Sequence, residues 1–247
     1  MAEGGGFGVL LERLAERRQL DIGVLGRSAD VAESELLSVL RGGEPSPCLL
    51  RRLAPALGLH TSDLFVIAGA DVPDDLAPAD PKAGWHVPHL VRRAVALPPE
   101  QRNVLRRFVA SMPREERARP VRGPLAYEQY PDGPGAVLVR LVRNRNLGWT
   151  AMAKTFLLVT DRYWSAATYG EVGRGTIPLT ADLLADFCAV LDVPSDDLAA
   201  LTGIALPAVF SHAKPSIAGV AELIWDVRDL TERRLQEIGD LAGSMEW

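Results

Sequence analysis

A short stretch in the second half of the chain, residues 159–170, carries side chains that could contact nucleic acid. Its polar positions combine a cation, hydroxyl groups and small residues, and no carboxylate lies beyond the first turn. Such groups can donate to phosphates or meet base edges in the major groove of DNA. These positions are Arg162, Tyr163, Ser165, Ala166 and Tyr169. The alternative is an ordinary amphipathic helix whose polar face meets only water.

The same stretch has the start and stop signals of a helix. Thr160 can cap it by accepting a bond from a free N–H group of the first turn. Gly170 offers an easy end. Trp164 and Ala167, three residues apart, form a stripe that can face a core. The sequence therefore predicts a helix over 159–170.

Positive charge gathers around this stretch, although the whole chain has a net charge of −5. Residues 134–175 hold six basic and two acidic residues. Hydrophobic residues make up 47% of the 247 residues, which is enough for real cores and for two compact domains.

Several classes of protein are disfavoured by the sequence. No apolar run reaches membrane-spanning length, and the first residues lack the pattern of a signal peptide. Cys48 and Cys188 are expected to be buried free thiols in a reducing cytosol. His86 and His89 have no further ligands at metal spacing, so a loop or helix-cap role is favoured over a metal site. Because no phosphate-binding glycine loop, nucleophile elbow or carboxylate pair occurs, we expect no enzyme, no cofactor and no catalytic residue.

Apolar spacing predicts five helices in the first 70 residues. Asp21 is expected to cap the second helix, and Asp30 to adopt the left-handed conformation in the turn that follows it. The expected helices are 7–18, 22–28, 32–40 or 33–40, 49–57 and 63–68.

The same plan returns in the second half of the chain. Residues 137–147 match 10–20 at an offset of 127, which pairs Arg18 with Arg145. The stretch 159–170 matches the third helix at an offset of 128, with one residue inserted in the turn 157–159. The fifth helix begins at Ser195 at an offset of 134, so six further residues are assigned to the loop 171–176. The remaining expected helices are 149–156 and 182–191.

This five-helix plan resembles the Cro/C1-type (XRE) family of helix-turn-helix domains. The residues that carry the resemblance are Leu14, Leu20, Asp21, Leu25, Gly26, Val31, Leu36, Val39, Gly42, Pro45 and the run 57–64, with Met152 and Ala153 matching in the second copy. Two departures are Gly26, where the family has a small alanine, and the absence of a glycine in the turn 157–159. The resemblance implies a DNA-binding domain whose third helix enters the major groove.

The sequence therefore predicts an all-α chain with two tandem five-helix helix-turn-helix domains, each followed by a helical hairpin. Domains are expected at 7–70, 71–133, 134–204 and 205–247. This hypothesis requires the cores at 7–68 and 135–202 to superpose and 159–170 to be helical. The hairpins at 87–112 and 216–245 have more apolar residues than a helix pair can bury alone. We expect them to pack on each other or on a second chain.

The two copies differ in how well the side chains of their third helices suit DNA binding. Glu33 and Glu35 lead the third helix of the first copy and would face phosphates, so this copy is expected to pack against protein, with Leu37 in the contact. The second copy is the expected reader. Its candidate DNA-binding residues are Arg143, Arg145, Thr150, Lys154, Thr160, Arg162, Tyr163, Ser165, Ala166, Tyr169 and Arg174. Each arginine among them could equally be a solvated surface charge.

The function expected from this pattern is sequence-specific transcriptional regulation through double-stranded DNA, in the cytoplasm and at the nucleoid. Pairing of domains within the chain, homodimerisation through the hairpins, or both would supply enough phosphate contacts. The alternative is a protein-interaction or small-molecule-sensing module that uses the fold without reading DNA. A small-molecule or protein effector is compatible with either hypothesis.

Overall fold

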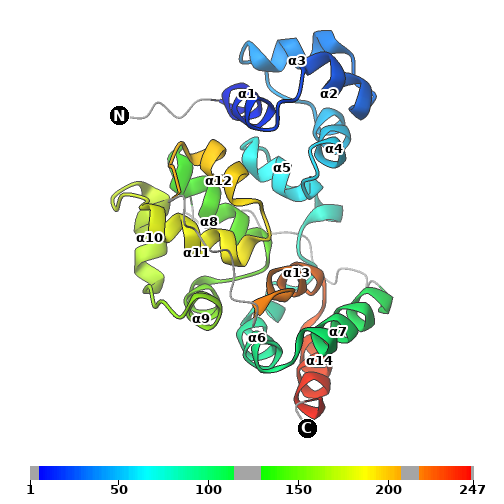
Figure 1. Cartoon of the computed structure of the whole chain (residues 1–247), viewed down its shortest axis with the longest axis vertical. Coiled ribbons are helices and arrows are strands. Elements are labelled where there is room, and N and C mark those ends of the chain that lie inside the picture. The colour runs from blue at the N-terminus through cyan, green and yellow to red at the C-terminus, as the bar shows by residue number, and fades with distance from the viewer. Residues whose placement is uncertain (1–5, 114–128, 207–216, 246–247) are drawn as a thin grey trace.

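The protein is all-α, as the sequence predicts. A computed structural model describes residues 6–113, 129–206 and 217–245, and within these ranges the chain forms helices and turns without a strand. In Figure 1 the first five helices lie at the top, the helices of the second half lie at the left, and the hairpins lie below. No helix in the described ranges is long and apolar enough to cross a membrane.

The first five helices, here called the first unit, confirm the expected plan. Asp21 caps the second of them by accepting a bond from the Val24 N–H at 3.1 Å. Asp30 is left-handed with φ 52°, which ends that helix as expected. The helices are α1 (Phe7–Arg17), α2 (Ile22–Ala29), α3 (Glu33–Leu40), α4 (Pro47–Ala56) and α5 (Thr61–Ile67).

The second half repeats this order of five helices, and we call it the second unit. Its helices are α8 (Pro134–Asn144), α9 (Trp149–Thr160), α10 (Ala166–Arg174), α11 (Ala181–Leu191) and α12 (Ser195–Thr202). The helix order supports the repeat, while the domain limits inferred from the sequence stay predictions.

The expectation of a single helix over 159–170, which the tandem-domain hypothesis required, is wrong; the third helix of this unit lies at 166–174 instead. Thr160 is the last residue of α9, and its hydroxyl donates to the Phe156 carbonyl at 2.9 Å instead of capping a new helix. Asp161 then ends α9 in the left-handed conformation with φ 59°. Ser165 caps α10 by accepting from the Thr168 N–H at 3.2 Å. The physical reason is that Val159 is buried on α9, so this helix continues through the expected turn until a residue that tolerates φ above zero.

The extra residues of the second unit therefore lie before α10, and their assignment to 171–176 is wrong. The starts of α1 and α8, and those of α2 and α9, are 127 residues apart. The separation rises to 133 for α3 and α10, and to 134 for the last two pairs. In this register Ala166 matches Glu33, and the offset of 128 expected for the third helix is wrong.

Burial and close packing support this register. Leu36 and Val39 of α3 are buried, and so are the matching Tyr169 and Val172 of α10. Gly8 of α1 lies so close to the Val39 carbonyl oxygen that a Cβ would collide with it. Gly135 of α8 stands in the same relation to the carbonyl oxygen of Val172. Both units thus use a glycine at the same point to bring the first and third helices together.

The two hairpins pack on each other, as one of the expected arrangements requires. α6 lies against α13 and α14, and α7 also contacts both. α6 additionally packs on α9, which joins the hairpins to the second unit. These helices are α6 (Val87–Ala96), α7 (Pro99–Ser111), α13 (Val220–Asp226) and α14 (Glu232–Ser244), with short 3-10 turns η1 (Asp74–Leu76) and η2 (Ala83–Trp85) in the linker.

The two cysteines differ in their surroundings. Cys188 is a buried free thiol whose pKa is raised by burial to about 12. Cys48 is also free but exposed near the start of α4, so its expected burial is wrong. The buried face of that helix is formed by Leu49, Leu50, Leu53 and Ala54, and Cys48 lies outside this stripe.

Candidate nucleic-acid interface

The eleven candidate residues fall into three groups in the structure. Nine of them reach the surface at least in part, and two are buried. The exposed residues are Thr150, Lys154, Arg162, Tyr163 and Arg174; the half-buried ones are Arg143, Thr160, Ser165 and Ala166; the buried ones are Arg145 and Tyr169.

One side of α9 and the turn after it form an exposed surface. Thr150, Lys154 and Leu157 follow one another at helical spacing on the solvent side of α9. Leu157 is 41% exposed, and Tyr163 in the turn is 66% exposed. Lys154 has no ion pair within the described residues. It is therefore a cation that is available to a phosphate.

The start of α10 is small and uncharged. Ala166, Ala167 and Thr168 occupy the positions that match Glu33, Ser34 and Glu35 in the first unit. Ala167 is exposed, so its expected place in an inward stripe with Trp164 is wrong. The actual inward residues are Tyr169 and Val172, because α10 begins later than expected and its helical phase changes. Small side chains at a helix start allow close approach of an anion to the backbone N–H groups.

Arg162 lies in the turn before α10, not at the start of a helix. Its guanidinium approaches the carboxylates of Asp182 at 3.6 Å and Asp186 at 3.7 Å. The indole N–H of Trp164 also donates to Asp186, at 2.8 Å. Burial raises the pKa of Asp186, and the Trp164 bond and the Arg162 charge act against that rise. Arg162 thus compensates a buried carboxylate, which leaves less of its charge for a phosphate.

Tyr169 belongs to the core of the second unit. Its ring lies 4.9 Å from the ring of Phe156 and 6.1 Å from that of Phe187, measured between centroids. Burial raises the pKa of its hydroxyl. The expectation that Tyr169 contacts a base or sugar is wrong, because the inward phase of α10 places it opposite α9 and α11.

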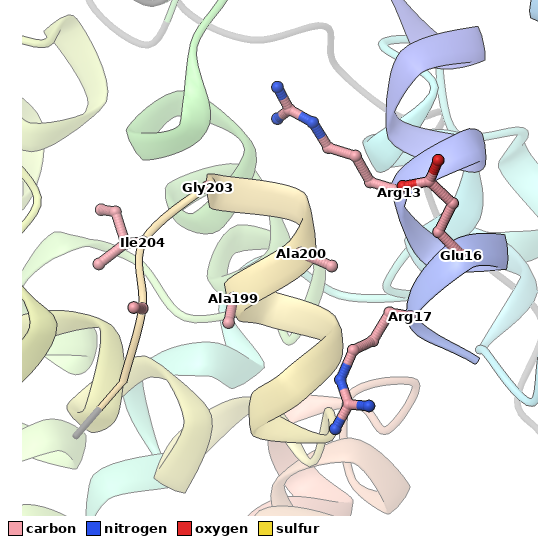
Figure 2. Close-up of a pocket in the computed structure, with 8 residues that line it drawn as sticks. Arg13, Glu16, Arg17, Ala199, Ala200, Gly203 and Ile204 are labelled. Carbon is pink, nitrogen blue, oxygen red and sulfur yellow. The ribbon is translucent and has the colours of Figure 1, made fainter. Parts of the chain in front are cut away.

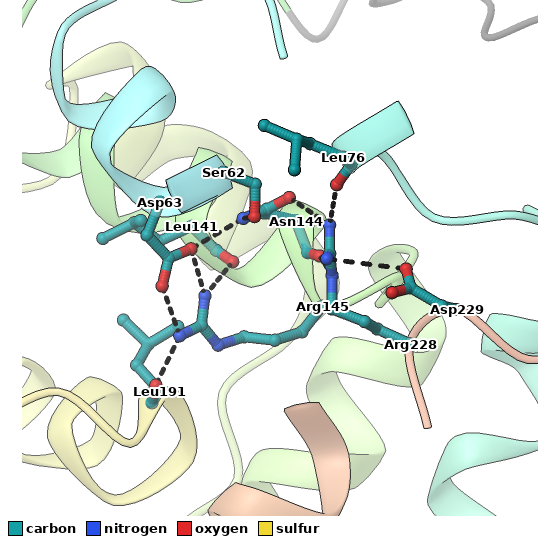
Figure 3. Close-up of polar contacts among 9 residues, drawn as sticks. All are labelled: Ser62, Asp63, Leu76, Leu141, Asn144, Arg145, Leu191, Arg228 and Asp229. Atoms are coloured by element: carbon teal, nitrogen blue, oxygen red, sulfur yellow. Dashed lines mark hydrogen bonds and ion pairs between the residues drawn. The ribbon is translucent and has the colours of Figure 1, made fainter. Parts of the chain in front are cut away.

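Arg145 is also buried, so its expected contact with the DNA backbone is wrong. Its guanidinium donates to both carboxylate oxygens of Asp63, at 2.7 and 2.8 Å, and to the Leu141 carbonyl at 3.0 Å. Figure 3 shows this ion pair between the end of α8 and the start of α5. Both side chains are almost fully buried, at 0% and 1% exposure. Arg145 therefore holds the two units together.

Further polar and aromatic groups complete this junction. Arg228 donates to the backbone and side-chain oxygens of Asn144 at 2.7 and 2.8 Å, and to the Leu76 carbonyl at 2.6 Å (Figure 3). The Trp225 ring stacks on His60 with centroids 3.5 Å apart. The guanidinium carbons of Arg228 and Arg145 lie 4.4 and 5.0 Å from the centre of the same indole. Burial lowers the pKa of His60. The sequence contains one signal for this junction, which is the internal repeat: when the two copies are aligned, Arg145 matches Arg18.

The contact between the units is reciprocal. α8 packs on α5, and α1 packs on α12, which are matching helices with the two units exchanged. Arg18, the residue that follows α1, bonds Asp197 of α12 at 3.0 Å, just as Arg145, the residue that follows α8, bonds Asp63. An interface in which matching residues exchange roles has two-fold character. The repeat therefore pairs its own two copies within one chain.

The interface between the units has two ends, the α1–α12 contact and the α5–α8 contact, and different side chains lie at each. At the α1–α12 end an open cleft of about 540 Å³ lies beside Arg13 and Arg17, as Figure 2 shows. Arg17 also pairs there with Asp196. At the α5–α8 end the residue that matches Arg17 is Asn144, whose oxygens are occupied by Arg228. Within the described ranges, a residue from outside the repeat, Arg228, thus fills the α5–α8 end of the interface.

The histidine pair is not gathered into a larger ligand cluster. His86 stands just before α6, but its side chain makes no capping bond to that helix; its Nε2 lies 3.0 Å from a carboxylate oxygen of Glu232. The ring of His89 accepts a bond from Arg93 at 3.2 Å. Among the described residues no three histidine, cysteine, aspartate or glutamate side chains are grouped for a metal ion.

With this geometry established, the chain was compared with known proteins. No family model matches it, and no curated protein or solved structure gives a significant match.

Proposed function

We propose that the protein is a sequence-specific DNA-binding regulator in which two helix-turn-helix units are paired within one chain. The observation that carries the proposal is the reciprocal contact of α1 with α12 and α8 with α5. A single unit of this kind meets few phosphates, and pairing can add contacts from those parts of the first unit that lie away from the start of α3. Such a regulator would act on DNA in the cytoplasm, at the nucleoid.

The second unit is the proposed reader, with a revised set of contacts. Lys154, Thr150 and Arg174 remain exposed and can reach backbone phosphates. Ala166 and Ala167 at the start of α10 allow close approach, whereas Glu33 and Glu35 at the matching place on α3 repel phosphate. The preference for the second unit therefore rests on the absence of carboxylates at the start of α10 more than on Arg162.

The proposal is tested by binding of the full chain to DNA. Purified protein is mixed with random genomic fragments, and the bound fragments are recovered and sequenced. Enrichment of a common sequence with affinity that falls as salt rises would support the proposal. Binding that is absent or independent of salt would refute it. Lys154→Gln should weaken binding, and Lys82→Gln, an exposed lysine beside η2, serves as the matched control.

A second candidate function is a protein-interaction module that does not read DNA. It is favoured by the exposed Glu33 and Glu35 on α3 and by the exposed apolar surfaces of Leu157 and Tyr163. In that case replacing Leu157 with a charged residue would abolish partner capture, and DNA would not compete with the partner. A small-molecule or protein effector is compatible with both functions.

A further inference from the structure

Helix α7 carries apolar residues on two of its faces. Leu105 and Val109 are buried, where α7 meets α13 and α14. Val104 and Phe108, one helical turn apart, are 46% and 44% exposed on the outer face. The packing between the hairpins therefore uses only half of the apolar surface of α7.

Helix α14 shows that the hairpin does not require an apolar residue at the position of Val104. Both helices have 13 residues, and their starts at Pro99 and Glu232 are 133 residues apart. In this register buried residues match, since Ile238 and Ala242 stand where α7 has Leu105 and Val109. The residue of α14 that matches Val104 is Glu237, whereas the residue that matches Phe108 is Leu241, which is half-buried and packs against the core. Exposed positions of α14 hold only polar residues, namely Arg233, Gln236, Glu237, Asp240 and Ser244.

Charges of opposite sign lie along the outer face of α7. Glu100 precedes Val104 by four residues, and Arg107 follows it by three; both are exposed. At 1.5 Å per residue they lie about 6 Å and about 4.5 Å from Val104 along the helix axis. If two α7 helices cross antiparallel at Val104, each Glu100 comes level with Arg107 of the partner helix. The face is thus complementary to itself in both charge and hydrophobicity.

We propose that the outer face of α7, formed by Glu100, Val104, Arg107 and Phe108, binds a second copy of this chain. The contact is antiparallel and two-fold, with Val104 at its centre and, one helical turn to either side, Phe108 of each copy beside a Glu100–Arg107 ion pair. A two-fold contact uses the same surface on both copies and closes at a dimer. This inference concerns assembly and does not depend on DNA binding.

The first test is sedimentation equilibrium of the full chain without DNA, over about a hundredfold range of concentration. The wild type should show a reversible monomer–dimer equilibrium. Val104→Glu copies the residue that α14 has at the matching position. Together with Phe108→Glu, it should raise the dissociation constant of the dimer by about tenfold or more, because central apolar residues dominate such contacts. Val24→Glu on α2, where the valine is 44% exposed, is the matched control and should leave the dimer unchanged.

The second test reverses the charges. Glu100→Arg and Arg107→Glu should each weaken the dimer, because each places like charges together across the contact. The double variant E100R/R107E restores both ion pairs with exchanged signs and should recover the wild-type dissociation constant. A general loss of folding cannot produce this recovery. A wild type that is monomeric throughout, an assembly larger than a dimer, or a double variant no tighter than the single ones would overturn the proposal.

Discussion

Arg145 of the second unit forms a buried ion pair with Asp63 of the first, and Arg18 of the first unit pairs in the same way with Asp197 of the second. Arg18 and Arg145 are matching residues at an offset of 127, and Asp63 and Asp197 match at an offset of 134. The two pairs differ in their exposure to water. Arg145 and Asp63 are sealed from solvent, whereas the Arg18 side chain is 23% exposed.

This difference predicts unequal costs for the two aspartates. Asp63→Ala leaves the Arg145 charge buried without its carboxylate and should lower the free energy of unfolding by about 3–5 kcal/mol. Asp197→Ala should cost less, about 1–3 kcal/mol, because Arg18 can turn toward water. Urea unfolding of both variants measures the difference. The double variant D63L/R145M should recover much of the loss, since an apolar pair needs no charge compensation. Equal losses from the two single variants would contradict the conclusion that the Arg145–Asp63 ion pair is more deeply buried than the Arg18–Asp197 pair.

Asp186 should make the stability of the protein depend on pH. Its carboxyl pKa in the folded state is raised above the ordinary 3.8, chiefly by burial. Between 3.8 and the folded value the folded state binds more protons than the unfolded state, so stability falls as pH rises through this window. Asp186→Asn keeps an oxygen for the Trp164 N–H and removes the titrating group. We expect this variant to lose part of the pH dependence and to be more stable at neutral pH.

The measurement for Asp186 is urea unfolding at several pH values from about 3 to 8, a range that begins below the ordinary carboxyl pKa. Asp182→Asn is the control, because that side chain is 76% exposed. If Asp182→Asn flattened the pH dependence as much as Asp186→Asn, burial would not be the cause.

Lys154 should contribute one phosphate contact to DNA binding. Lys154→Gln is expected to weaken binding to all sequences alike and to reduce the slope of log affinity against log salt by about one. Arg162→Ala should change this slope less, because Asp182 and Asp186 already lie beside the guanidinium. Titration of labelled DNA at several salt concentrations checks both variants. A larger slope change from Arg162→Ala would restore that residue as the principal cation.

The start of α10 should be sensitive to negative charge. Ala166→Glu gives the second unit the residue that Glu33 supplies in the first. The new carboxylate would face phosphates at a cost of about 1 kcal/mol or more, which is roughly a fivefold loss of affinity. Gln236→Glu on α14 changes the net charge equally and is the control. If both variants weakened DNA binding equally, the net charge of the protein would determine affinity, and the position of the new carboxylate at the start of α10 would not.

The sequence alone determined the helical class, the order of helices and the repeat. These features follow from local chemistry: Asp21 caps α2 through a neighbouring N–H, Asp30 tolerates the left-handed turn, and apolar spacing defines which residues can face inward. The alignment of the two repeats also shows that Arg18 and Arg145 occupy matching positions.

The tertiary structure decided which of these residues meet solvent. Helical spacing fixes the relative phase of side chains, but the absolute phase depends on where a helix begins. Because Val159 is buried in the core, α9 extends to Thr160 and α10 begins only at Ala166. This start places Tyr169 on the inward face of α10. Arg145 reads as a surface cation until α5 brings Asp63, 82 residues away in the chain, against it. Burial of a charge depends on a partner that only the packing of distant helices supplies.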